Sequence, residues 1–193
     1  MTIVVAHLFA PFPGPGGARA EDLRRLGDRF GPETVRFIAE IFDAMDVMLL
    51  GRAAYEAMSR YWPAAAEADA ALAARLNGLP KTVFSTTLEE PLAWTGSTLA
   101  PGDVAAEVRA LAERGVPRVG VVGSRALARS LSRAGLLDGY RQLMDAVALH
   151  GRSPGPIFED CDRTDLSLES SRILDSRLVE LEYAVRIRER AAA

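Results

Sequence analysis

The sequence predicts an α/β domain with a mixed, mostly parallel sheet, helices on both faces and an antiparallel end. Between residues 33 and 134, short apolar runs alternate with amphipathic helical segments, the order typical of parallel strands joined by crossover helices. From residue 165 onward the apolar period changes to two, which predicts antiparallel strands. No repeat or linker interrupts the 193 residues. We therefore expect a single domain over residues 1–187 and a frayed tail over residues 188–193.

The first part of the chain predicts one strand, two helices and a central strand. Residues 3–9 open with β-branched residues and stop before Pro11, as a buried strand does. Residues 11–17 are rich in proline and glycine, so they predict a loop, and residues 21–30 predict a short helix. Apolar residues at helical spacing predict a helix over 33–44, which leads directly into a strand over 47–50.

Glycine and proline set the limits of the later elements. The expected helices are 53–61, 64–76, 104–114 and 125–134, and the expected strands are 81–85, 97–99 at an edge, 118–122 and 139–149. A loop over 150–156 precedes two antiparallel strands, 165–173 and 177–187, joined around Asp175 and Ser176. In the last strand, one face carries Leu178, Glu180, Glu182 and Ala184, and the other carries Val179, Leu181, Tyr183 and Val185.

Composition argues against several classes of protein. A net charge of −3 disfavours nucleic acid as the main partner. One cysteine cannot form an internal disulfide or a cysteine-based zinc site, and two histidines are too few to predict a metal centre. The N-terminus lacks the pattern of a signal peptide, and no apolar run approaches the roughly 18 residues that would span a membrane. A cytoplasmic protein is the default expectation.

Three predicted strands end in residues that suit phosphate or ribose. These ends read Leu50-Gly51-Arg52, Phe84-Ser85-Thr86 and Val122-Gly123-Ser124-Arg125. The carboxyl ends of parallel strands share one edge of a sheet, and helices that begin there offer free N–H groups to anions. A dinucleotide with an extra ribose phosphate would use all of these groups. Each segment alone also fits an ordinary tight turn, and the Gly-x-Gly-x-x-Gly pattern is absent.

An ordered series of motifs resembles a known family. The series is Leu49-Leu50-Gly51-Arg52-x-x-Tyr55-Glu56, Tyr61-Trp62-Pro63, Leu79-Pro80-Lys81-x-Val83-Phe84-Ser85-Thr86-Thr87-Leu88, Gly123-Ser124-x-x-Leu127 and Gly135-Leu136-Leu137-Asp138. It resembles the dihydrofolate reductase-like superfamily, in the branch typified by the C-terminal reductase domain of bacterial riboflavin biosynthesis. The resemblance implies a three-layer fold, a mixed sheet of about eight strands flanked by helices, NADPH as cofactor and homodimers.

The resemblance also implies roles for individual residues. Gly51 and Arg52 match the turn that holds the adenosine end of NADPH, and Ser85 and Thr86 match the hydroxyls near the ribose 2′-phosphate. The loop that cradles the pyrophosphate is matched by Gly123, Ser124, Arg125 and Ala126.

The substrate half of the family pattern is altered. The Ser-Leu-Asp-Gly motif expected after the first strand reads His7-Leu8-Phe9-Ala10-Pro11, which has no carboxylate. Ala54 replaces a hydroxyl expected after Gly51 and Arg52, and the glycine-rich motif expected late in the chain reads Met144 to Arg152. The cofactor half is therefore better kept than the substrate half.

Few residues are candidates for contact with a small-molecule substrate. His7, Tyr55 and Trp62 lie near the expected pocket, although a histidine on an apolar strand and aromatic residues at helix ends more often pack in the core. No residue is assigned as catalytic. Two functions remain open: an NADPH-dependent reductase of a small heterocyclic or carbonyl-type substrate, and a catalytically degenerate ligand-binding or dimeric interaction module on the same fold.

Overall fold

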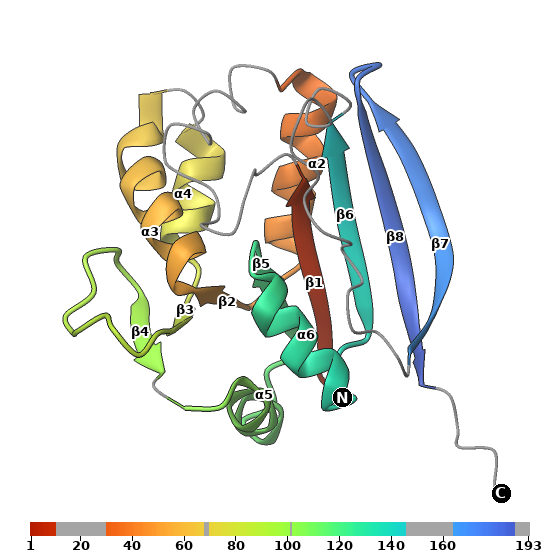
Figure 1. The fold of residues 1–193 in the computed structure, drawn as a ribbon. Coiled ribbons are helices and arrows are strands. Elements are labelled where there is room, and N and C mark those ends of the chain that lie inside the picture. The colour runs from red at the N-terminus through yellow and green to blue at the C-terminus, as the bar shows by residue number, and fades with distance from the viewer. Residues whose placement is uncertain (11–29, 68–69, 101, 146–163, 188–193) are drawn as a thin grey trace, which may run out of the picture.

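The computed structural model describes residues 1–10, 30–67, 70–100, 102–145 and 164–187. Within them lies one eight-stranded sheet with the strand order β4-β3-β2-β5-β1-β6-β8-β7 (Figure 1). The loops predicted at 11–17 and 150–156, all but the last residue of the short helix predicted at 21–30, and the tail at 188–193 lie outside the described residues.

The sheet is parallel except at one end. Six strands pair in parallel, and β8 runs antiparallel to both β6 and β7. The strands are β1 (Ile3–Ala10), β2 (Val47–Gly51), β3 (Lys81–Phe84), β4 (Ser97–Ala100), β5 (Arg118–Val122), β6 (Gly139–Asp145), β7 (Thr164–Leu174) and β8 (Leu178–Ile187). The predicted mixed, mostly parallel sheet with antiparallel C-terminal strands is confirmed.

One predicted helix is wrong in its first half. The expected helix over 64–76 is a 3₁₀ segment, η1 (Trp62–Glu67), followed by α4 (Ala70–Gly78). Pro63 has no N–H to donate, so the chain leaves α3 through a tighter turn instead of starting a new α-helix at residue 64. The other described helices are α2 (Pro32–Asp43), α3 (Arg52–Tyr61), α5 (Val104–Glu113) and α6 (Arg125–Arg133).

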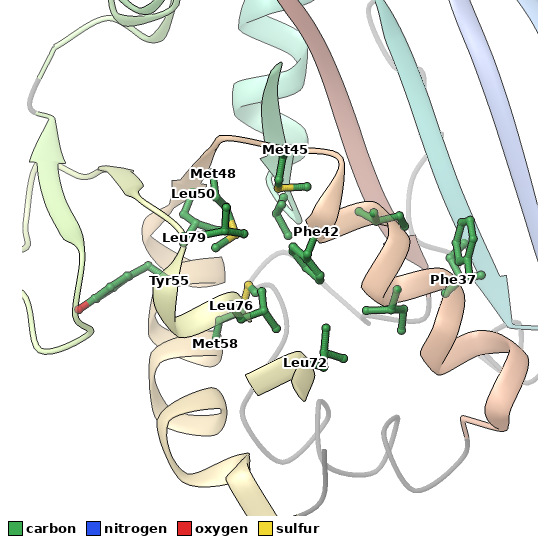
Figure 2. Packing of buried hydrophobic residues seen from close by; sticks show 14 of the residues in the cluster. Phe37, Phe42, Met45, Met48, Leu50, Tyr55, Met58, Leu72, Leu76 and Leu79 are labelled. Atoms are coloured by element: carbon green, nitrogen blue, oxygen red, sulfur yellow. The ribbon is translucent and has the colours of Figure 1, made fainter. Parts of the chain in front are cut away.

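Helices cover both faces of the sheet, as predicted. Helices α2, α3 and α4 pack on one face, where Phe37, Met58 and Leu76 belong to the same apolar core as Leu50 of β2 (Figure 2). On the other face, residues of α5 and α6 meet Leu49 of β2. The side chains of β2 are buried on both faces because successive residues of a strand point in opposite directions.

The hairpin between β7 and β8 caps α2. The carboxylate of Asp175 accepts hydrogen bonds from the N–H groups of Glu33 (3.2 Å) and Thr34 (3.0 Å) and from the Thr34 hydroxyl (2.6 Å). In return, the Asp175 N–H donates to the Glu33 carboxylate at 2.6 Å. The Thr34 hydroxyl, with these N–H groups, lowers the pKa of Asp175. A side chain from the far end of the sequence thus satisfies the first turn of α2.

The only lysine of the chain, Lys81, is buried at the start of β3. Its ammonium donates to the carbonyls of Asn77 (3.2 Å), Leu79 (2.7 Å) and Thr95 (3.1 Å) and lies 4.4 Å from the centroid of the Trp94 ring. Burial lowers its pKa to about 8. The charge therefore joins the end of α4 to the connection between β3 and β4.

No described helix is long and apolar enough to cross a membrane.

Candidate functional site

The three predicted anion-binding turns lie on one edge of the sheet. Leu50 at the end of β2 is paired with Val122 at the end of β5, and His7 of β1 is paired with the same valine. Gly51 is paired with Phe84, the last residue of β3. The turns that follow β2, β3 and β5 therefore meet, as the parallel arrangement requires.

Two of these turns are in close contact. A Cβ atom placed on Gly51 would lie 2.8 Å from Oγ of Ser124, so this hydroxyl would have to move to make room for a side chain. Gly123 has a φ of +68°, which favours glycine, and a Cβ atom there would lie 3.5 Å from Cβ of Ala54. The N–H of Gly123 donates to the carbonyl of His7 at 3.0 Å. The turns after β2 and β5 therefore lie against each other, and the turn after β5 is also hydrogen-bonded to β1.

Two helices begin at this contact. Helix α3 starts at Arg52 after Gly51, which provides no side-chain cap. Helix α6 starts at Arg125 after Ser124, whose Oγ accepts from the N–H of Leu127 at 3.4 Å. The first N–H groups of each helix have no partner within the helix, and the helix dipole adds positive potential there. Together the two helix ends form a place suited to a diphosphate.

Arg52 connects the turn after β2 with the turn after β3. Its Nη1 donates to Oγ1 of Thr87 at 3.4 Å, and the side chain is exposed. The hydroxyl oxygen of Ser85 accepts from the N–H groups of Thr87 (3.1 Å) and Leu88 (3.0 Å), so it holds this turn together, whereas Thr86 is exposed. Thr87 was missed as a site residue, although the run of three hydroxyls from Ser85 was the signal for it.

The remaining candidates divide between this edge and the interior. Arg125 and Ala126 are in the first turn of α6, half-buried and exposed respectively. Tyr55 is in the first turns of α3, but its hydroxyl points away from the core residues of Figure 2 and accepts from the N–H of Trp94 at 3.2 Å. Trp62 follows the last residue of α3, about 15 Å along the helix from Arg52. The structure does not bring Trp62 to the strand edge.

His7 is buried on the α2 side of β1. Its side chain is 5% exposed, and a Cβ atom on Gly120 of β5 would lie 3.5 Å from the ring. Burial, with a smaller contribution from the charge of Arg141, lowers its pKa to about 3. The ring is therefore neutral at pH 7. Within the described residues, no group of three or more histidine, cysteine or acidic side chains is arranged to hold a metal ion.

A comparison of the sequence with models of protein families agrees with the motifs and with the geometry of the site. The model of the RibD C-terminal domain matches residues 19–179. The chain belongs to this family. Members of the family typically use NAD(P)H. A comparison with curated proteins found no match.

Solved structures share the fold across the whole length of the chain. A protein named for riboflavin biosynthesis from Shewanella sp. PV-4 is 15% identical, with a TM-score of 0.64 over 96% of this chain and 99% of its own. A pyrimidine reductase-like protein from Corynebacterium diphtheriae is 13% identical, with a TM-score of 0.57 over 97% of this chain and 93% of its own. These similarities establish the dihydrofolate reductase-like fold.

Proposed function

We propose that the protein is an NADPH-dependent reductase of a small heterocyclic or carbonyl-type substrate. The observation that carries this proposal is the contact between the N-terminal ends of α3 and α6, where Gly51 meets Ser124. Two helix N-termini with Arg52 beside them suit a dinucleotide diphosphate. Family membership supports the nicotinamide cofactor, and the names of the similar structures support a heterocyclic substrate.

The residues at the strand edge fit the parts of NADPH. Gly51 and Arg52 would hold the adenosine end, and Ser85 and Thr86 the ribose 2′-phosphate. The pyrophosphate would lie at the start of α6, against Gly123, Ser124, Arg125 and Ala126. When bound, the nicotinamide supplies a hydride, and the chain binds and orients the two reactants.

The proposal is tested by titrating the protein with NADPH and with NADH while following nicotinamide fluorescence. We expect saturable NADPH binding that Arg52→Ala weakens by about ten- to a hundredfold, because one or two charge-assisted hydrogen bonds are lost. Arg60→Ala is the matched control, since Arg60 is exposed in the last turn of the same helix. Absence of binding at millimolar NADPH would rule the reductase out.

A catalytically degenerate ligand-binding module is the second candidate. Ala54 offers only a methyl group at the helix end, and residues 7–11 carry no carboxylate. Both departures remove polar groups from the site. Oxidation of NADPH with a panel of heterocycles and carbonyl compounds separates the two functions: a reductase consumes the cofactor, whereas a binding module only retains it.

We also propose that the protein is a cytoplasmic homodimer. Strand pairing places Leu166, Leu168 and Ile173 of β7 on the same face as Val179, Leu181, Tyr183 and Val185 of β8. Leu168 is 54% exposed and Ile173 is 72% exposed. Among the described elements, the helices on this side, α5 and α6, do not lie over β7 and β8 (Figure 1). A second copy of the same apolar face would cover it.

A further inference from the structure

A row of polar side chains crosses the sheet beneath α2. His7 of β1 is paired with Arg141 of β6, and Arg141 is paired with Glu182 of β8. Paired residues point to the same face, and Leu143 and Leu178, which share that face, pack in the core with residues of α2. The position is unusual because the α2 face of the sheet is otherwise mostly apolar.

Five charged side chains of the sheet and of α2 form an alternating ion row, in the order Glu40, Arg172, Glu180, Arg141 and Glu182. Glu180 is at its centre, 0% exposed, with Nε of Arg141 and Nε of Arg172 each 3.6 Å from one of its oxygens. Arg141 also donates from Nη2 to Glu182 at 2.6 Å. Arg172 extends to Glu40 of α2 at 3.6 Å. The row is therefore fixed at both ends.

Several buried atoms of this row and of the neighbouring His7 form no hydrogen bond within the described part of the chain. They are Nδ1 of His7, Nε of Arg141 and both carboxylate oxygens of Glu180. The two ion pairs of Glu180 are too long to be hydrogen bonds. Burying such groups without hydrogen-bond partners is unfavourable, most of all when they are charged. A fold that keeps three such side chains together is suited to receive a polar partner.

His7, the neighbour of Arg141 across the sheet, lies beside the candidate cofactor site. The carbonyl of His7 accepts from the N–H of Gly123, the first residue of the turn before α6. Arg141 is the next side chain across the sheet and is 20% exposed, whereas Glu180 is fully buried. This is the side of the site where residues 7–11 lack a carboxylate.

We propose that Arg141 binds the substrate, by donating hydrogen bonds to a carbonyl, lactam or carboxylate oxygen, and that His7 is the second polar contact. Glu180 and Glu182 are positioning residues that hold the guanidinium in place. This inference rests on the proposed reductase function, and it assigns the site a substrate that carries a hydrogen-bond acceptor rather than a cation.

The arrangement also defines what these residues contribute to a reduction. As the hydride adds to an unsaturated carbon, the electron pair of the C=O or C=N bond moves to its oxygen or nitrogen. The guanidinium of Arg141 stabilises the negative charge that develops there, and water supplies the proton that completes the reduction. The low pKa of His7 keeps its ring neutral, so it forms a hydrogen bond and does not act as the acid.

The test uses three planar probes: sodium benzoate, benzamide and benzylammonium chloride. Each is titrated into the protein, with and without NADPH, while the ring resonances of His7 are followed by NMR. The chain has two histidines, so His7→Asn assigns the signal. We expect saturable shifts with benzoate and benzamide and none with benzylammonium.

Arg172 provides a matched control, because it lies at the same 3.6 Å distance from Glu180 but on the edge strand β7. We expect Arg141→Met to weaken benzoate binding at least about tenfold and Arg172→Met to change it less than about twofold. If Arg141→Met does not fold, Arg141→Met combined with Glu180→Gln removes the buried pair together. Equal weakening by the two arginine variants would overturn the proposal.

The same samples separate the two proposals. A wild-type protein that binds NADPH but shows no saturable shift with benzoate or benzamide would overturn the role of Arg141 alone. A protein that shows the benzoate shift without binding NADPH would overturn the reductase function, while keeping Arg141 as an acceptor-binding residue.

Discussion

Gly51 shows how a single residue adjusts the contact between two turns. The end of β2 approaches Ser124 so closely that a Cβ atom on Gly51 would displace the Ser124 hydroxyl. The same contact brings the N-termini of α3 and α6 together. Local sequence explains the glycine as a turn residue, and the structure adds that it is also a contact between neighbouring turns.

Gly51→Ala is expected to separate these turns. The new methyl group would displace Oγ of Ser124, which accepts from the N–H of Leu127 at the start of α6, so we expect a loss of about 0.5–2 kcal/mol in the free energy of unfolding, together with weaker NADPH binding. Urea unfolding and fluorescence titration measure the two effects. Adding Ser124→Gly, which removes the overlapping side chain, should recover part of the stability. A Gly51→Ala protein with unchanged stability and affinity would contradict the packing argument.

His7 is expected to make the protein sensitive to acid. The unfolded chain protonates this histidine near pH 6.5, but the folded chain does so only near pH 3, so the unfolded state binds more protons between these values. Stability is therefore lost as the pH falls from 6.5 toward 3, by about 2 kcal/mol between pH 7 and pH 5. Urea unfolding at both pH values measures this loss. The His7→Asn variant should lose less stability than the wild-type protein between these pH values. An equal loss of stability in the two proteins would show that other groups cause the effect.

At the scale of secondary-structure elements, α2 depends on the hairpin between β7 and β8. Asp175 adopts a φ of +50° in the turn and places its carboxylate over the first turn of α2. Gly31 occupies the N-cap position and has no side chain to serve as a cap. The helix and the hairpin are therefore stabilised together, although they are far apart in the sequence.

Asp175→Ala is expected to loosen this junction. The N–H groups of Glu33 and Thr34 lose their acceptor, so they should exchange with solvent faster, and the melting temperature should fall. Hydrogen exchange with mass spectrometry of residues 30–43 reports the change. Asp175→Asn keeps one side-chain oxygen and should retain more protection than the alanine variant. Equal protection in all three proteins would show that the cap is dispensable.

At the scale of the whole molecule, the layers are unequal. Helices α2, α3 and α4 cover one face, whereas α5 and α6 cover only part of the other (Figure 1). The apolar face of β7 and β8 is the part of the described sheet where exposed leucine and isoleucine side chains gather. Strict alternation along β7 would place Leu168 and Ile173 on opposite faces of the sheet. The bulge between Leu168 and Ser170 shifts the register by one residue, so both side chains lie on the same face.

Replacing this face is expected to give a monomer. Light scattering coupled to size-exclusion chromatography should find a dimer for the wild-type protein and a monomer for the double variant Leu168→Glu, Ile173→Glu, because like charges would meet across the two-fold axis. Ser171→Glu, on the same strand and on the same face, tests how far the interface extends. A wild-type monomer at micromolar concentration would contradict the dimer.

The local sequence predicted most of the fold. The alternation of strands and helices, the antiparallel end and the two faces of β8 are short-range patterns, so each could be read from its own segment. The failure at residues 64–76 has a local cause as well. An alanine-rich run favours an α-helix, but Pro63 and the packing of Trp62 against the core replaced its start with a 3₁₀ segment.

The candidate site was partly predictable for the same reason. Gly51, Arg52, Gly123 and Ser124 are turn residues at strand ends, and a parallel sheet places such ends on one edge. Thr87 was not included, because only the folded turn shows that its hydroxyl meets Arg52. The sequence predicted on which face of β8 Glu180 lies. The burial of Glu180 between Arg141 and Arg172 could not be predicted, because it depends on three strands and one helix.

Most of the elements, their order and the three turns that converge on the candidate cofactor site follow from the sequence alone, because spacing and turn chemistry within short segments specify them. The folded structure was needed to show that Asp175 caps a helix 141 residues away in the sequence, that the hydroxyl of Tyr55 binds the connection before β4, and that a buried carboxylate lies beside Arg141 near the strand edge of the candidate site. These are contacts between distant segments. Strand register and helix packing fix them, and neither can be read from a single stretch of chain.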